Sequence, residues 1–254
     1  MALPLWLLAH PLFLDYSDNW HNGNKWFCFS ALSYAMIIFM DKIRSILFWV
    51  MTLFLVGCTP SATADIRQGE LLYSTPFDSA VRWDTREQGA VKIGVRDGAY
   101  RMTANVNQFV MGFGVGDYTD VVITVDANQL SPHPKNAYGV ACRASIADGS
   151  TNGYYFLIGG DGTASLRMGR WGEIKPIIAW YSTPLVNSGV AVNRMKVICV
   201  DDYLALYVND RLVYEMRDDT FASGYVGFLM ASEAGYTTEI AFDNLFVYMG
   251  EMGN

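Results

Sequence analysis

The residues best suited to recognising a ligand lie in the middle of the chain. Aromatic side chains gather there, at Tyr154, Tyr155, Trp171, Trp180 and Tyr181, with Arg143, Asp161 and Arg170 as polar neighbours. Aromatic rings offer flat apolar surfaces with polar edges, and binding sites combine such surfaces with a few placed polar groups. Sugar rings are ligands of this kind. The combination therefore indicates carbohydrate binding on a sheet face or loop.

Four of these residues are the predicted contact residues. Trp171 and Trp180 are the candidate aromatic platforms. Arg143 and Tyr155 lie opposite in phase to clearly apolar neighbours, so we expect both to face outward. The alternative is that the aromatic residues belong to the core, which strand alternation predicts for about half of them.

The acidic residues do not form a recognisable catalytic set. Glu173, Glu215, Glu233 and Glu239 are isolated, and the pairs Asp201-Asp202 and Asp218-Asp219 have the character of turn residues. A Ser-His-Asp arrangement is also not apparent, because His133 lies in a proline-flanked loop without a nucleophile elbow nearby. The sequence leaves enzymatic activity uncertain and favours a protein that is not an enzyme.

Two cysteines lie in the globular part of the chain. Cys142 and Cys199 each fall inside an expected strand, whereas Cys28 and Cys58 lie in the N-terminal region. An exported domain folds in an oxidising compartment, so a Cys142–Cys199 disulfide is favoured over two buried thiols. On the chain-entropy model this bond would stabilise the fold by about 4 kcal/mol. Metal binding by cysteine is disfavoured, because CxxC spacing is lacking and His133 is the only histidine after Cys58.

Residues 40–58 have the order of a lipoprotein signal peptide. A short basic stretch precedes an apolar run from Ile46 to Val56. The sequence Leu55-Val56-Gly57-Cys58 resembles the lipobox of bacterial lipoproteins, in which the cysteine is lipidated and becomes the mature N-terminus. We therefore expect an exported, membrane-anchored protein with a lipid on Cys58, on the periplasmic or cell-surface side. Residues 59–70 would then form a tether.

Other interpretations of the N-terminal region remain open. An ordinary transmembrane anchor is one, although the apolar run is shorter than the roughly 20 residues that span a bilayer. Residues 1–39 are rich in Trp, Phe and Leu but contain a polar island from Asp15 to Lys25. Because a lipoprotein signal should begin close to its basic stretch, we expect translation to start at Met40 and residues 1–39 to be a mis-assigned extension. An extra membrane segment around Trp26 to Met40 is the alternative.

The rest of the chain has the pattern of antiparallel strands. Apolar and polar residues alternate in short runs, for example at Val121, Ile123 and Val125, and Gly, Asp or Asn close each run. The pairs Asp97-Gly98 and Asn209-Asp210 predict tight hairpin turns. About twelve short strands without a convincing helix predict an all-β fold, a two-sheet antiparallel β-sandwich or jelly roll. It would span residues 71–248, with a tail at 249–254.

Several stretches resemble concanavalin A-like lectin/glucanase domains and follow the order found in them. They are AYGVACRASIADGSTNGYYF from Ala137, GGDGT from Gly159, ASGYVG from Ala222 and AFDNLFV from Ala241. The closest in style are laminin G-like and 3-keto-disaccharide hydrolase-type domains of exported bacterial proteins. The resemblance implies a concanavalin A-like sandwich. It does not imply one activity, because the superfamily includes glycanases, lectins and sugar-binding modules.

The resemblance implies two further tests of the sequence. A retaining glycanase of this superfamily would carry Glu-x-Asp-x-x-Glu, or a form one residue shorter, on one strand to place two carboxylates about 5 Å apart. The sequence lacks that motif. Many such domains hold a structural Ca²⁺ between the first and last strands, and Asp243 and Asp78 are the candidate oxygen ligands here. A hydrogen bond to neighbouring backbone is the alternative role of Asp243.

Charge and motifs together rank the functional hypotheses. A net charge of −7 disfavours nucleic acid as a partner, because an acidic domain repels phosphate backbones. The leading hypothesis is a lipid-anchored β-sandwich that binds carbohydrate at the cell envelope without catalysis. The alternatives are a glycoside-acting enzyme of the same fold with an unrecognised active site, and a structural or adhesion lipoprotein that contacts protein partners.

Overall fold

The chain forms strands throughout the part that the computed structural model describes, residues 64–253 apart from 80–81, 115 and 148–149. The strands are β1 (Ile66–Thr75), β2 (Arg86–Gln88), β3 (Val91–Arg96), β4 (Ala99–Ala104), β5 (Val110–Phe113), β6 (Val121–Gln129), β7 (Asn136–Ala147), β8 (Ser150–Gly159), β9 (Thr163–Arg170), β10 (Glu173–Ser182), β11 (Val192–Val200), β12 (Tyr203–Val208), β13 (Arg211–Arg217), β14 (Tyr225–Ser232) and β15 (Thr238–Met252). Over these residues, helices of the length and apolarity needed to cross a membrane are absent. The predicted extension, signal peptide and Cys58 lie outside the described residues.

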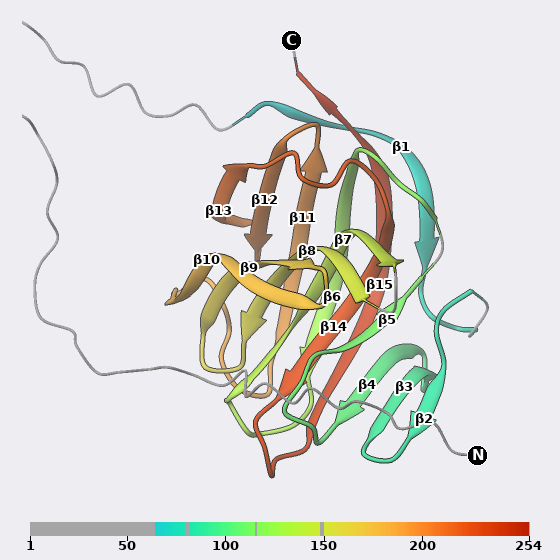
Figure 1. Ribbon diagram of the computed structural model, residues 1–254, viewed down its shortest axis with the longest axis vertical. Helices are drawn as coiled ribbons and strands as arrows, with labels where there is room; N and C mark the ends of the chain where they lie inside the picture. The colour runs from blue at the N-terminus through green and yellow to red at the C-terminus, as the bar shows by residue number, and fades with distance from the viewer. Residues whose placement is uncertain (1–63, 80–81, 115, 148–149, 254) are drawn as a thin grey trace, which may run out of the picture. The chain divides into compact units, whose positions relative to one another are not determined.

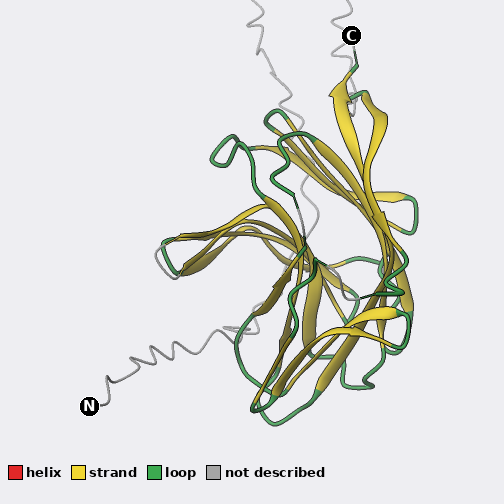
Figure 2. Cartoon of the chain, turned by 90° about the vertical axis from the view of Figure 1, so that its right-hand side faces the viewer, coloured by secondary structure: helices red, strands yellow, loops and turns green. Residues whose placement is uncertain are grey.

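Two antiparallel sheets form the sandwich. One contains nine strands in the order β13-β12-β11-β6-β15-β4-β3-β2, with β1 paired to β15, and the other contains six in the order β10-β9-β8-β7-β14-β5. Figure 1 shows the six-stranded sheet in front of the nine-stranded one, and Figure 2 shows the two from the side. The predicted all-β, two-sheet sandwich is confirmed.

The main core fills the space between the sheets. Alternate residues of most strands enter it, and it includes an aromatic group of Phe77, Trp83, Tyr100, Phe228 and Phe242. The rings of Phe228 and Phe242 stack with centroids 4.1 Å apart, and those of Trp83 and Phe228 with centroids 4.8 Å apart. Period-two alternation therefore directs one face of each sheet inward, as expected for half-buried strands.

The turns follow the sequence prediction, and the chemistry of proline accounts for one edge of the sheet. Asp97 and Gly98 have φ values of 53° and 70°, and Asn209 and Asp210 have values of 52° and 65°. These left-handed conformations match the tight hairpins expected of Asp-Gly and Asn-Asp pairs. Strand β10, which contains Pro176, lies at the edge of the six-stranded sheet, where a residue without an N–H donor is tolerated.

A bulge in β15 changes the side-chain directions that simple alternation would give. Simple alternation places Phe242 and Leu245 on opposite faces, yet both are buried in the main core, at 0% and 1% exposure. The register between β15 and β6 shifts between Asp243 and Phe246, and Asn244 has φ of 52°. The extra residue restores the inward phase of the strand after the bulge.

The first strand of the chain, β1, begins earlier than predicted, and the last strand, β15, ends later. Ile66 pairs with Met252, so β1 includes residues assigned to the tether and β15 includes residues assigned to the tail. Backbone pairing forms this ribbon, and Gly69 and its polar neighbours show little side-chain alternation. Ile66 and Met252 also pack against a second apolar cluster centred on Ile198, outside the main core.

Candidate functional site

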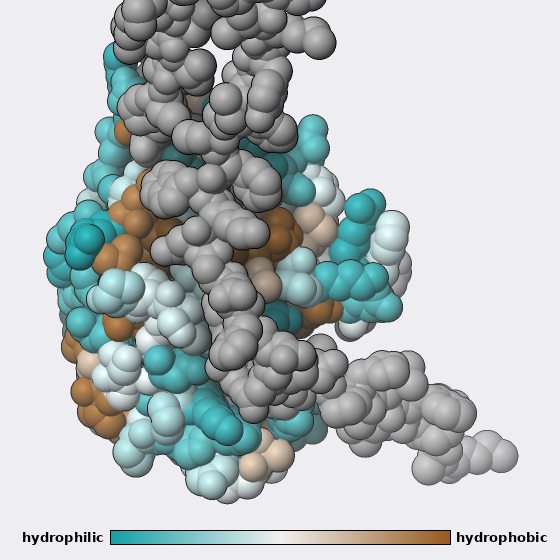
Figure 3. Space-filling model, turned by 90° about the vertical axis from the view of Figure 1, so that its left-hand side faces the viewer, coloured by the Kyte–Doolittle hydropathy of each residue, from teal (hydrophilic) through white to brown (hydrophobic). Residues whose placement is uncertain are grey.

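The outer face of the six-stranded sheet, the face directed away from the main core, carries its own apolar cluster. Buried members are Ala141, Ala144, Tyr155, Leu157 and Leu229, and half-buried members are Phe109, Met111, Phe113, Ile174 and Trp180. The buried members thus lie on the middle strands β7, β8 and β14, and the half-buried ones lie on or next to the margin strands β5 and β10. Figure 3 shows apolar residues, in brown, among hydrophilic ones on one side of the molecule.

Cross-strand pairing aligns the outer face in two central rows. The first row runs Arg167, Tyr155, Ala141, Gly227 and Phe113, on strands β9, β8, β7, β14 and β5. The second row runs Ser165, Leu157, Gly139, Leu229 and Met111 on the same strands. Residues directly opposite on paired strands lie on one face of the sheet. The rows contain one cation and two aromatic rings but neither Asp nor Glu.

Trp180 and Arg167 form the polar and aromatic margin of this face. The Arg167 Cζ atom lies 5.7 Å from the centroid of the Trp180 ring, a cation–π contact. Both side chains are half-buried. Burial lowers the pKa of the Arg167 guanidinium. The sequence prediction included Trp180 but not Arg167. The outward direction of Arg167 was available from the sequence, because Arg167 follows the inward-facing residue Leu166 on the same strand.

Tyr155 has the predicted phase but not the predicted exposure. It lies on the outer face, opposite in direction to the core residue Phe156, and is nevertheless fully buried. The Tyr155 hydroxyl donates to the Thr151 carbonyl oxygen at 3.1 Å, and a Cβ atom at Gly169 would lie 2.2 Å from that hydroxyl. The prediction that Tyr155 is exposed is wrong, because its ring extends over the glycine of the adjacent strand.

Trp171 lies at the turn between β9 and β10, at the opposite end of β10 from Trp180. Its side chain is 78% exposed and its φ is 54°, in the left-handed region that bulky residues rarely adopt. The Trp171 backbone N–H donates to Asn152 Oδ1 at 3.0 Å, and Arg170 Cζ lies 4.1 Å from the Trp171 ring centroid. The two predicted tryptophans therefore occupy one hairpin without forming one site.

Arg143 is buried, and the prediction that it faces outward is wrong. The register between β7 and β8 shifts between Cys142 and Ser145, and Arg143 itself has φ of 50°. This bulge turns the side chain into the end of the sandwich, where it is only 2% exposed. Period-two alternation cannot locate such a shift from one sequence.

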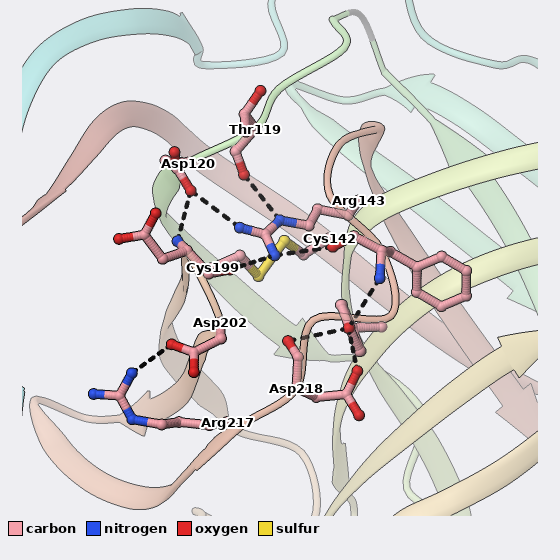
Figure 4. Close-up of polar contacts among 11 residues, drawn as sticks. Thr119, Asp120, Cys142, Arg143, Cys199, Asp202, Arg217 and Asp218 are labelled. Atoms are coloured by element: carbon pink, nitrogen blue, oxygen red, sulfur yellow. Dashed lines mark hydrogen bonds and ion pairs between the residues drawn. A yellow bond between two sulfur atoms is a disulfide. The ribbon is translucent and has the colours of Figure 1, made fainter.

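The guanidinium of Arg143 donates hydrogen bonds to four acceptors, shown in Figure 4. Nε donates to the Thr119 carbonyl at 2.9 Å, and Nη1 donates to the carbonyls of Asp201 at 2.8 Å and Phe221 at 2.9 Å. Nη2 donates to Asp120 Oδ1 at 3.1 Å. We call these five residues the Arg143 clamp. Because it joins β7 to three loops and engages all three nitrogen atoms of the guanidinium, its chemistry is structural.

Two further contacts surround the clamp. A disulfide joins Cys142 of β7 to Cys199 of β11 and so links the two sheets. Beside it, the Tyr154 hydroxyl donates to Asp218 Oδ1 and accepts from the Phe221 N–H at 3.2 Å. Burial, followed by the hydrogen bond to Asp218, raises the pKa of Tyr154 to about 12.

Eight acidic residues of the described part of the chain take part in ion pairs. Seven basic residues, on both sheets, have a carboxylate within ion-pair distance: Lys92, Arg101, Lys135, Arg143, Lys175, Arg194 and Arg217. His133 Nε2 also lies 3.3 Å from Glu233 Oε2. The hydrogen bond from Arg194 is the main cause that lowers the pKa of Asp126.

The two predicted metal ligands are not gathered with other ligands. Asp243 Oδ1 accepts from the Asn244 N–H at 2.7 Å, which is the alternative role foreseen for it, and Asp78 is exposed. Across the described ranges, groups of three or more His, Cys, Asp or Glu that could hold a metal ion are absent. A structural Ca²⁺ stays a prediction.

Comparison with known proteins identifies the fold. No family model matches the sequence. No curated protein matches it either. A Bacillus subtilis protein of unknown function with a galectin-like fold is similar in structure, with TM-score 0.57 and 16% identity over 74% of this chain and 100% of that chain.

Two glycan-acting proteins are also similar in structure. A Bacillus licheniformis β-glucanase has TM-score 0.53 and 10% identity, covering 72% of this chain and 99% of its own. A structure of the endo-acting O-glycanases of the human gut microbiota has TM-score 0.53 and 13% identity, covering 71% and 99%. The chain therefore has the concanavalin A-like fold that its short sequence patterns predicted. At these identities the likeness establishes the fold alone.

Proposed function

We propose that this protein binds carbohydrate, without cleaving it, through the outer face of the six-stranded sheet. Trp180 supplies a ring on which a sugar can stack, and Arg167 supplies donors beside it. Phe113 and Met111 form the opposite margin, with the buried residues of β7, β8 and β14 between. The arrangement combines an apolar surface with one placed polar group, as ligand sites commonly do.

The residue composition of the two central rows favours binding over catalysis. Glycosidases of the common type need two carboxyl groups on either side of the scissile bond, about 5–10 Å apart. Neither row of the outer face contains an Asp or Glu. The second candidate, a glycoside-acting enzyme, is favoured by the fold shared with the β-glucanase and the O-glycanases.

Binding to a glycan array by the full-length protein in detergent tests the proposal. We expect saturable binding to one glycan class, weakened at least 10-fold by Trp180→Ala. Trp171→Ala is the matched control, because it removes a tryptophan from the same hairpin but not from the outer face. Loss of binding in Trp171→Ala alone would move the site to the hairpin turn. Cleavage of the bound glycan would show that the protein is a glycoside-acting enzyme. Lack of binding across the array would favour a lipoprotein that contacts protein partners.

We also propose that the domain is exported and anchored through Cys58. The lipobox supports this proposal, as does the Cys142–Cys199 disulfide, which suits an oxidising compartment. Replacing the cysteine (Cys58→Ser) should abolish labelling by a fatty acid and release the protein from the membrane fraction. Equal labelling of the variant would refute the anchor. A structural Ca²⁺ is tested separately, since it should raise the melting temperature in millimolar Ca²⁺ relative to chelator.

A further inference from the structure

Among the described residues, Arg167 is a half-buried cation to which the fold gives neither an opposite charge nor a hydrogen-bond acceptor. Its Nε atom is buried without a hydrogen-bond acceptor. Over the described residues, no carboxylate lies within ion-pair distance of the Arg167 guanidinium, which stacks against the Trp180 ring. Buried donors normally find an acceptor, and a buried charge normally finds an opposite charge.

Other arginines of the chain show what such a partner looks like. Arg101 has Asp97 and Glu239, and Arg194 has Asp126 in a two-point contact through Nε at 2.9 Å and Nη2 at 3.2 Å. Arg194 is 61% exposed and could remain hydrated without its carboxylate. Arg167 is more buried and has none. The acceptor missing at Arg167 can therefore be supplied from outside the chain.

The surroundings of Arg167 restrict the kind of acceptor. Tyr155 lies beside it on β8, and Trp180 lies over its guanidinium. Tyr155 uses its hydroxyl hydrogen on Thr151, so it does not compensate the charge. A guanidinium matches a planar carboxylate through two parallel hydrogen bonds, and desolvation strengthens that pair.

We infer that the glycan bound at the outer face is acidic, and that a carboxylate on one of its sugar residues pairs with Arg167 while the sugar ring stacks on Trp180. This inference rests on the proposed carbohydrate binding and adds the charge class of the ligand. The pairing gives Arg167 the acceptor that its own chain does not provide. Phe113 and Met111, the half-buried apolar residues of the rows, then contact the remainder of the glycan.

The test compares uronate oligosaccharides with the same oligosaccharides after reduction of their carboxyl groups to alcohols. These probes share linkage and ring shape and differ in the carboxylate. For full-length protein in detergent, we expect the acidic form to bind at least 10-fold more tightly, with an advantage that shrinks as salt rises. Sulfated oligosaccharides form a third arm.

Substitutions of arginine test whether Arg167 is the residue that recognises the carboxylate. Arg167→Gln should remove the preference for the acidic form, and Arg167→Lys should retain only part of it, because lysine lacks the planar fork. Arg170→Gln is the matched control, since Arg170 lies on the same strand but stacks on Trp171. Melting temperatures verify folding of each variant. If Arg167→Gln does not fold, the Arg167→Lys ratio of acidic to neutral affinity decides the question.

Failure of the inference differs from failure of the proposed function. Equal binding of acidic and reduced probes, lost in Trp180→Ala, would overturn the acidic ligand and retain carbohydrate binding. Preference for the sulfated arm over both other arms would overturn the carboxylate. Absence of binding to any probe, acidic or neutral, on these probes and on the array would overturn both proposals.

Discussion

Arg143 and Arg167 lie on neighbouring parts of one sheet, yet their environments are opposite. The Arg143 guanidinium meets three backbone carbonyls and one carboxylate, whereas the Arg167 guanidinium meets one aromatic ring. A buried polar group that is hydrogen-bonded at each of its nitrogen atoms within the fold contributes to stability. A partly buried guanidinium without an acceptor in the fold can take one from water or from a ligand. The clamp and the outer face thus separate structural from binding chemistry.

The largest expected effect concerns the disulfide beside the clamp. Its closed loop spans 57 residues, so the chain-entropy model gives about 4 kcal/mol of stabilisation. We expect the double variant Cys142→Ala/Cys199→Ala to lose about that much free energy of unfolding in guanidinium chloride. Glycan affinity of the folded variant should not change. Mass spectrometry under non-reducing conditions is the check on the bond itself, and two alkylated cysteines would contradict it.

Replacement of Arg143, the arginine of the clamp, should cause the second-largest loss of stability. Arg143→Ala leaves three carbonyls without their donor and Asp120 without its cation, and loss of one partner of a buried pair costs about 3 kcal/mol. Chemical denaturation measures the change. Arg194→Ala is the control for an exposed ion pair and should cost less than about 1 kcal/mol. Arg167→Ala should cost less than Arg143→Ala, and the reverse order would abolish the distinction between the two regions.

Alkaline pH should weaken the clamp end of the sandwich. The pKa of Tyr154 is raised from 10.0 to about 12 in the fold, chiefly by burial. The stability that comes from its neutral hydroxyl is complete below pH 10 and is lost as the pH rises through 12. The loss of stability between these values should therefore be smaller in Tyr154→Phe than in the unmodified protein. Parallel pH profiles would contradict the expectation.

The smallest effect is expected at the exposed turn. Trp171 adopts a left-handed conformation that Asn tolerates better, so Trp171→Asn should change the free energy of unfolding by less than about 1 kcal/mol, towards stabilisation. Thermal unfolding measures it. A large destabilisation would show that the Arg170–Trp171 contact holds the hairpin together and is not a surface feature.

The sequence predicted the sandwich because its information is local. Alternation at Val121–Val125, the Asn209-Asp210 turn and Pro176 each determine the structure of a few residues, and these local choices agree. The bulges at Arg143 and Asn244 were not predictable, because they depend on pairing with strands distant in the sequence. The candidate site was partly predictable: Trp180 was found from its type, whereas the importance of Arg167 depends on which acceptors surround it.

The ribbon of β1 and β15 has a mechanical consequence. β1 enters the fold at Ile66, and its pairing with β15 runs from Ile66–Met252 to Thr75–Leu245. A force applied from the N-terminal side pulls along β1, and antiparallel hydrogen bonds lie perpendicular to that direction. The bonds are then loaded together in shear and do not open one by one. A domain that is anchored on its N-terminal side and binds a polymer through its outer face would resist tension through this ribbon.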